Sequence, residues 1–152
     1  MELNMEQLRE FLDEKVRQYN APSFIELDPI QIPHMYSSKE DIEISGFLAA
    51  TISWGNRTSI IRSAKRMMEL MGNSPYDFIM NHKDEHLKKM DGFVHRTFNS
   101  TDLMTFIEAL KCLYQHRDGL EGLFTEYKTV ESIQPAIHQL NQEFFTVPHL
   151  KR

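Results

Sequence analysis

Apolar residues recur at helical spacing along most of this chain. Between residues 5 and 19 they lie three or four positions apart, and Asn4 with Gln7 has the spacing of a capping box, which predicts an amphipathic surface helix. Residues 20–38 hold three prolines and show no period, which favours an irregular connection packed along the body. A helix from Ser38 to about Ser53 should follow. Its later turns are apolar on nearly every side, as in a helix surrounded by others.

The rest of the chain continues in the same way. Further helices are predicted over about 58–72, 74–79, 100–118, 120–127 and 132–148, the last ended by Pro148. Residues 82–90 favour a marginal helix, and residues 93–98 are too few to assign. No segment has the alternation and the β-branched content of a strand. We therefore predict an all-α protein of seven or eight helices, in one globular domain over residues 1–152.

Composition narrows the class of protein. A chain of 152 residues, 41% hydrophobic and 26% charged, is not collagen, low-complexity disorder or a disulfide scaffold. No apolar stretch approaches the ~20 residues of a membrane span, and the first residues do not form a secretory signal. With one cysteine, a cytoplasmic protein that does not enter membranes is expected. Residues 147–152 are typical of a linker leading onward, so we expect the N-terminal portion of a longer protein.

The net charge of −5 argues against a nucleic-acid partner, but the charges are unevenly distributed. Residues 1–45 hold four bases and ten acids, whereas the remainder is nearly balanced. Residues 54–68 contain no acid, and their basic side chains are Arg57, Arg62, Lys65 and Arg66. This segment is the locally basic part of the chain, and its charges suit phosphate contacts.

Two successive predicted helices carry a resemblance to known proteins. The apolar helix, the turn at residues 53–57 and the second helix up to Gly72 resemble the second and third helices of the helix-hairpin-helix base-excision DNA glycosylases. Together with residues 28–34, 74–78 and 93–98, they more closely resemble an uncharacterised bacterial family of conserved hypothetical proteins, itself similar to those glycosylases. The closer resemblance covers most of the chain. The glycosylase resemblance covers roughly residues 40–115.

The resemblance implies a DNA partner, damaged or with a flipped base. In the glycosylases the polar turn enters DNA where a base has been expelled, which implies that Asn56 and Arg57 contact the orphaned base. The basic residues of the next helix would bind phosphates. His95 and Arg96 lie between aromatic residues that suit stacking on a base. Each assignment has an alternative. Residues 53–57 would form a simple turn with Trp54 in the core, and the basic residues of the next helix would form a solvated face. His95 would cap a helix while Arg96 pairs with an acid.

The chemistry of the glycosylases needs elements that this sequence lacks. Those enzymes use a glycine-containing hairpin between two helices and an aspartate shortly after it, and no such hairpin is found here. We therefore expect this chain to bind DNA but to be inactive alone, whereas the complete protein would hydrolyse an N-glycosidic bond, with or without strand scission. The rival interpretation is a helical interaction module that keeps only the architecture. A third is an enzyme acting on another nucleobase-containing substrate.

Other reactive side chains carry weaker signals. His82 and His86 are spaced to share a metal, but no third ligand follows at recognisable spacing, so neither a metal site nor a cofactor is expected. Cys112 lies beside the apolar face of a predicted helix with no base nearby, which favours a buried structural thiol over a nucleophile.

Overall fold

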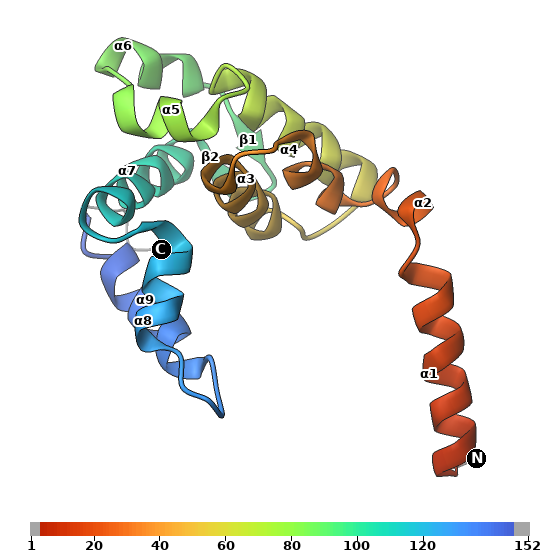
Figure 1. Cartoon of the computed structure of the whole chain (residues 1–152). Helices are drawn as coiled ribbons and strands as arrows, with labels where there is room; N and C mark the ends of the chain where they lie inside the picture. The colour runs from red at the N-terminus through yellow and green to blue at the C-terminus, as the bar shows by residue number, and fades with distance from the viewer. Residues whose placement is uncertain (1–3, 148–152) are drawn as a thin grey trace.

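The computed structural model describes residues 4–147, and helices make up most of that range (Figure 1). The helices are α1 (Met5–Tyr19), α2 (Pro22–Ile25), α3 (Lys39–Thr51), α4 (Arg57–Leu70), α5 (Pro75–Asn81), α6 (Asp84–Leu87), α7 (Ser100–His116), α8 (Gly119–Tyr127) and α9 (Gln134–Phe144). Three 3₁₀ turns are η1 (Pro29–Gln31), η2 (Pro33–Met35) and η3 (Lys88–Met90). The predicted all-α class is confirmed.

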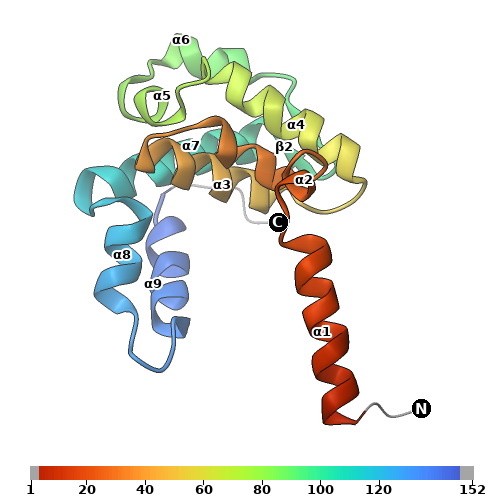
Figure 2. The same ribbon diagram turned by 45° about the vertical axis from the view of Figure 1, so that its right-hand side comes forward.

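Helix α3 lies at the centre of the body, as its apolar later turns predicted. It packs against α4, α5, α8 and both early 3₁₀ turns (Figure 2). Its residues Ile44 and Leu48 are completely buried. Helix α7 supplies the other large part of the core through Leu103, Ile107 and Leu110. The body is thus organised around two apolar helices, with the others placed on them.

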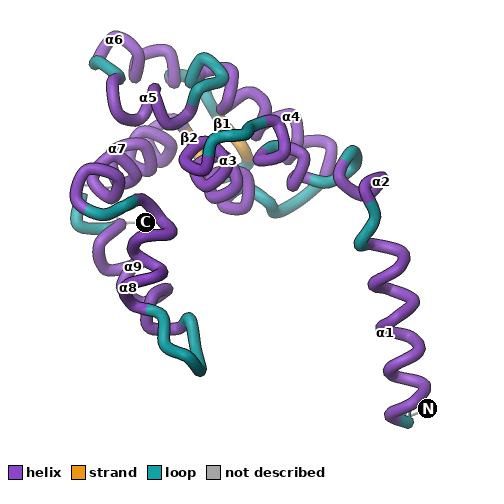
Figure 3. Tube along the Cα trace, viewed as in Figure 1, coloured by secondary structure: helices purple, strands orange, loops and turns teal. Residues whose placement is uncertain are grey.

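Residues 93–98, which the sequence pattern left unassigned, contribute to a small β-hairpin. Strands β1 (Val94–His95) and β2 (Phe98–Asn99) pair antiparallel, with His95 opposite Phe98 (Figure 3). Each strand has only two residues, too few for a visible alternation, so the prediction of no strand missed it. The hairpin packs β1 against α4 and β2 against α7. It therefore anchors the two residues between its strands beside α4.

Several predicted boundaries shift because caps come from unexpected residues. Helix α4 begins at Arg57, since the Asn56 side chain accepts the Ser59 N–H. Helix α5 runs on to Asn81, and its Tyr76 N–H is bound by Asp41 of α3 at 2.9 Å. The proline-containing connection forms α2, η1 and η2, so residues 4–147 hold nine α-helices where seven or eight were predicted. Helix α9 ends at Phe144, and the predicted stop at residue 148 lies outside the described residues.

Helix α1 extends away from the body (Figures 1 and 2). The predicted capping box is present: the Asn4 side chain accepts the Gln7 N–H at 2.8 Å and the Gln7 side chain accepts the Asn4 N–H at 3.1 Å. None of its residues is buried; Tyr19, at its C-terminal end, packs edge-to-face on Phe24 of α2, and the apolar side chains before it remain exposed. Within residues 4–147, no helix has the length and apolar character needed to cross a membrane.

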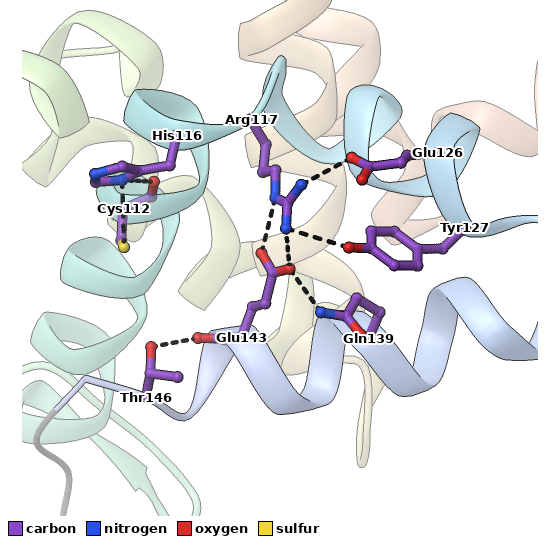
Figure 4. Close-up of polar contacts among 8 residues, drawn as sticks. All are labelled: Cys112, His116, Arg117, Glu126, Tyr127, Gln139, Glu143 and Thr146. Atoms are coloured by element: carbon purple, nitrogen blue, oxygen red, sulfur yellow. Dashed lines mark hydrogen bonds and ion pairs between the residues drawn. The ribbon is translucent and has the colours of Figure 1, made fainter.

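Two polar clusters fix helices α7, α8 and α9 to one another and to α3. Arg117 donates to both Glu143 oxygens, at 3.2 and 2.6 Å, and to Glu126 at 2.8 Å (Figure 4). The Arg117 hydrogen bonds lower the pKa of Glu143. The Tyr114 hydroxyl donates to Glu43 of α3 at 2.7 Å, and burial, followed by this bond, raises the pKa of Tyr114.

Candidate nucleic-acid interface

The turn between α3 and α4 is exposed along its whole length. Residues 53–58 are all exposed, and Trp54 keeps 38% of its surface. Gly55 adopts a φ of +114°, which a residue with a side chain rarely takes, so glycine here permits the sharp reversal between the helices. Trp54 is therefore at the surface of the turn, not in the core.

The hairpin brings the second predicted site to this turn. The Arg96 guanidinium lies 4.9 Å from the centre of the Trp54 ring, in cation–π geometry. Arg96 has a φ of +56°, and its side chain also lies against Gly55. Although 41 residues separate Trp54 from His95, the fold places the two predicted sites side by side.

His95 lies behind the turn, with only 4% of its surface exposed. Its Nε2 faces the Trp54 carbonyl oxygen at 3.4 Å, and its Nδ1 lies 2.9 Å from the Ser63 hydroxyl of α4. A carbonyl only accepts, so Nε2 carries a proton that it donates to the Trp54 carbonyl, while Nδ1 forms a hydrogen bond with the Ser63 hydroxyl. His95 thus positions the Trp54 backbone against α4, and its ring does not reach the surface.

Arg57 turns toward the connection that precedes α3. Its guanidinium lies 3.7 Å from the Asp28 carboxylate and over the Phe24 ring. Asp28 and Arg57 border an open pocket that is also lined by Gly46, Ala50 and Ser53. The sequence did not identify Asp28 as the partner of Arg57, because the two residues lie 29 positions apart in the chain.

The remaining predicted bases form a cationic row along α4, defined as Arg62, Lys65 and Arg66. These side chains are exposed and, with Lys89 from η3, they line a second open pocket beside β1. Arg66 lies 3.4 Å from Glu69, whereas within residues 4–147 no ion pair involves Arg62 or Lys65. Sequence reasoning missed Lys89, because only the fold brings residues 88–90 beside α4.

Hairpin residue Val94 links the turn to the cationic row. Its side chain is exposed and borders the second pocket, while Arg96, two residues on, covers Trp54. Two carboxylates, Glu69 and Asp91, border the same pocket. The hairpin therefore borders both the exposed Trp54 ring and a pocket lined by four basic and two acidic side chains.

The other reactive side chains lie elsewhere. His82 contacts Glu108 through Nε2 at 2.8 Å and the Phe78 carbonyl through Nδ1, whereas the His86 Nδ1 accepts the Lys83 N–H. The two histidines thus engage different groups.

A base does lie near Cys112, which corrects the prediction. The His116 Nδ1 is 3.7 Å from its sulfur (Figure 4). That nitrogen also donates to the Cys112 carbonyl at 2.9 Å, so it already carries a proton and cannot take one from the thiol.

The fold and this surface define a small helical protein with an exposed, cationic turn-and-hairpin face. The chain belongs to the family described as "protein of unknown function (DUF2400)", whose model matches residues 28–152. This confirms the predicted membership of an uncharacterised conserved family. No curated protein and no solved structure matches the chain. Helix α1 lies before the matched segment.

Proposed function

We propose that this chain binds DNA, damaged or with a flipped base, as the N-terminal part of a glycosylase-like repair protein. The observation that carries the proposal is a face on which the hairpin places Arg96 over the exposed Trp54 ring and Val94 beside the pocket of the cationic row. An aromatic ring beside a row of cations is the combination that proteins use to bind unstacked bases and the adjoining phosphates.

The proposal divides the face into two parts. The cationic row and Lys89 contact phosphates, which releases counterions and gives an affinity that depends on salt but not on sequence. The turn meets the gap left by an extruded nucleotide. There the Oδ1 of Asn56 already caps α4, which leaves its amide N–H₂ as the donor for a base.

The proposal concerns binding and not catalysis by this chain. The glycine-containing hairpin and the following aspartate of the glycosylases are absent from the sequence. Hydrolysis of an N-glycosidic bond is therefore assigned only to a complete protein that carries those elements.

The test is the salt dependence of binding to a duplex that contains an abasic-site analogue. We expect the affinity of the unaltered chain to fall as salt rises, and Arg62→Ala with Lys65→Ala to reduce the slope of log K against log salt by about 2, since each lost phosphate contact removes about 0.9. Fluorescence anisotropy at several salt concentrations measures both slopes.

A charge-matched control is Lys111→Ala with Lys128→Ala, which removes two positive charges from α7 and from the end of α8. It should leave the slope unchanged. Equal slopes for both double variants, or no binding by the unaltered chain, would contradict the proposal. Asn56→Ala should weaken binding to the gapped duplex more than to intact DNA.

A second candidate function is a non-catalytic interaction module. It is favoured by one observation, the largely exposed apolar face of α1. Absence of DNA binding combined with self-association or protein capture through α1 would support this candidate instead.

A further inference from the structure

The apolar row of α1, defined as Met5, Leu8, Leu12, Val16 and Tyr19, is exposed to solvent. Leu12, in the middle of the helix, retains 52% of its surface and Met5 retains 80%. Phe11 lies at the edge of this row, with the Lys15 ammonium over its ring. A contiguous apolar row on a projecting helix is a feature that soluble proteins normally cover with a partner.

A partner would also explain why the helix forms at all. At 15 residues, α1 has the length at which an isolated helix is marginal in water, and its own capping box offsets only part of the nucleation cost. Packing of an amphipathic face supplies most of the stability of helices in proteins. Within residues 4–147, no residue of α1 is buried, and the edge-to-face contact of Tyr19 with Phe24 of α2 covers only the C-terminal end of the row.

The spacing of the apolar row identifies the partner, because it is symmetric about Leu12. Leu8 and Val16 lie four positions on either side, and Met5 and Tyr19 lie seven positions on either side. When a second copy runs antiparallel across a two-fold axis at Leu12, each of these residues faces an apolar residue. Met5 then meets the partner's Tyr19, and Leu8 meets the partner's Val16.

The charges flanking the row fit the same arrangement. Arg9 and Asp13 lie on one flank of the row, and within one helix they are 3.9 Å apart and largely exposed. A two-fold axis perpendicular to the plane of the two helices keeps this flank facing the same flank of the partner. Arg9 then lies about 3 Å along the axis from the partner's Asp13, given a rise of 1.5 Å per residue. Two symmetric ion pairs result, and the helix dipoles oppose each other favourably.

We propose that this protein self-associates through α1, which pairs antiparallel with α1 of a second copy about a two-fold axis at Leu12. The contact is isologous, as in most homodimers. A contact between two helices that are each about 22 Å long buries less surface than the ~1,200 Å² of a stable interface. We therefore expect the dimer to form reversibly, in a way that depends on protein concentration. This inference is independent of the proposed DNA binding, because it uses none of the same residues.

Substitution at the axis tests the interface. Leu12→Lys places two ammonium groups together and should weaken the dimer at least tenfold in Kd, as measured by sedimentation equilibrium. Glu10→Lys, on the opposite face of α1, introduces the same charge away from the contact and should leave Kd within about twofold. Both variants should keep the Tm of the body, because α1 contributes no buried residue. A chain that stays monomeric at all concentrations, or equal effects of both substitutions, would overturn the proposal.

Disulfide trapping tests the direction of pairing. In a Cys112→Ser background, Leu12→Cys should oxidise to an interchain disulfide, whereas Met5→Cys alone should not, since antiparallel helices place the two residues about 21 Å apart. Combining Met5→Cys with Tyr19→Cys should restore cross-linking. Efficient cross-linking by Met5→Cys alone would indicate parallel helices and would refute the two-fold axis at Leu12.

Exchanging the charges of Arg9 and Asp13 tests whether these residues form ion pairs across the dimer. Arg9→Asp should weaken the dimer by removing both ion pairs, and Arg9→Asp with Asp13→Arg should recover most of the loss because the pairs re-form with exchanged partners. No recovery, or capture by α1 of a different protein in preference to a second copy, would count against self-pairing.

Discussion

At the scale of single residues, Gly119 shows how closely the body is packed. It begins α8 with a φ of +70°, and a Cβ at this position would lie 2.5 Å from the Tyr114 ring and 3.0 Å from the Glu43 carboxylate. Since the Tyr114 hydroxyl is bound to Glu43, the ring cannot move without breaking that bond. Glycine is therefore required here by space as well as by backbone conformation.

We predict that Gly119→Ala lowers the free energy of unfolding by about 2–4 kcal/mol, which combines left-handed strain with overpacking. Gly72→Ala is the matched control, because Gly72 has a φ of +66° but a Cβ there would meet no atom within 4 Å. It should cost only about 1–2 kcal/mol. Urea denaturation measures both values. An equal loss of unfolding free energy in both variants would mean that the Tyr114 ring moves aside at no cost.

Single residues were predictable where local chemistry decides their role. The capping box at Asn4 and the turn at Gly55 follow from side chains within a few positions of each other. The role of His95 could not be predicted from its neighbours in sequence. Its partners Ser63 and Trp54 lie 32 and 41 positions away, and only the hairpin brings them together.

At the scale of elements, the α8–α9 hairpin depends on the ion pair between Arg117 and Glu143. Arg117 lowers the pKa of Glu143 in the folded protein, so the unfolded chain binds this proton more readily. The contribution of Glu143 to stability is complete above its ordinary pKa and is lost as the pH falls through its lower, folded value.

We predict that Glu143→Gln lowers the Tm by roughly 2–4 °C at pH 7, because the charge-assisted bonds to Arg117 are weakened. Its Tm should approach that of the unaltered chain as the pH falls through the lowered pKa of Glu143 in the folded protein, below which Glu143 is protonated in both states. Calorimetry between pH 3 and pH 7 measures the two curves. A constant difference at every pH would contradict this role.

Among the elements, the long helices and the short α5 and α8 were predicted, whereas the strands and the short helices of the proline-containing connection were not. The periodic segments that form α1, α3, α4 and α7 extend over three or more turns, which is enough for the helical repeat to show. The strands β1 and β2 have two residues each, too few for a period to show, whereas the start of α5 was predicted from Ser74 and Pro75 although Asp41 of α3 also binds its first turn.

At the scale of the whole molecule, α1 and the body should be thermodynamically separate. Because no residue of α1 is buried, a chain covering residues 21–152 should keep the Tm of the full chain within about 2 °C at low protein concentration. Differential scanning fluorimetry measures this. A much larger loss would show that α1 packs on the body in solution.

The amphipathic pattern predicted α1 as a helix but could not say what covers its apolar face. An apolar row looks the same in sequence whether its own chain or another covers it. The prediction of the basic surface was similarly incomplete. The bases of residues 54–68 could be read from the sequence, but the placement of Lys89 and Arg96 beside them depends on the fold.

The projection of α1 from the body has a consequence for binding strength. Helix α1 and the cationic face use separate surfaces, so two chains joined through α1 would carry two such faces in one assembly. Attachment of the first face to a long duplex would then raise the effective concentration of the second, and the resulting avidity would exceed the affinity of either chain alone wherever the geometry lets both engage.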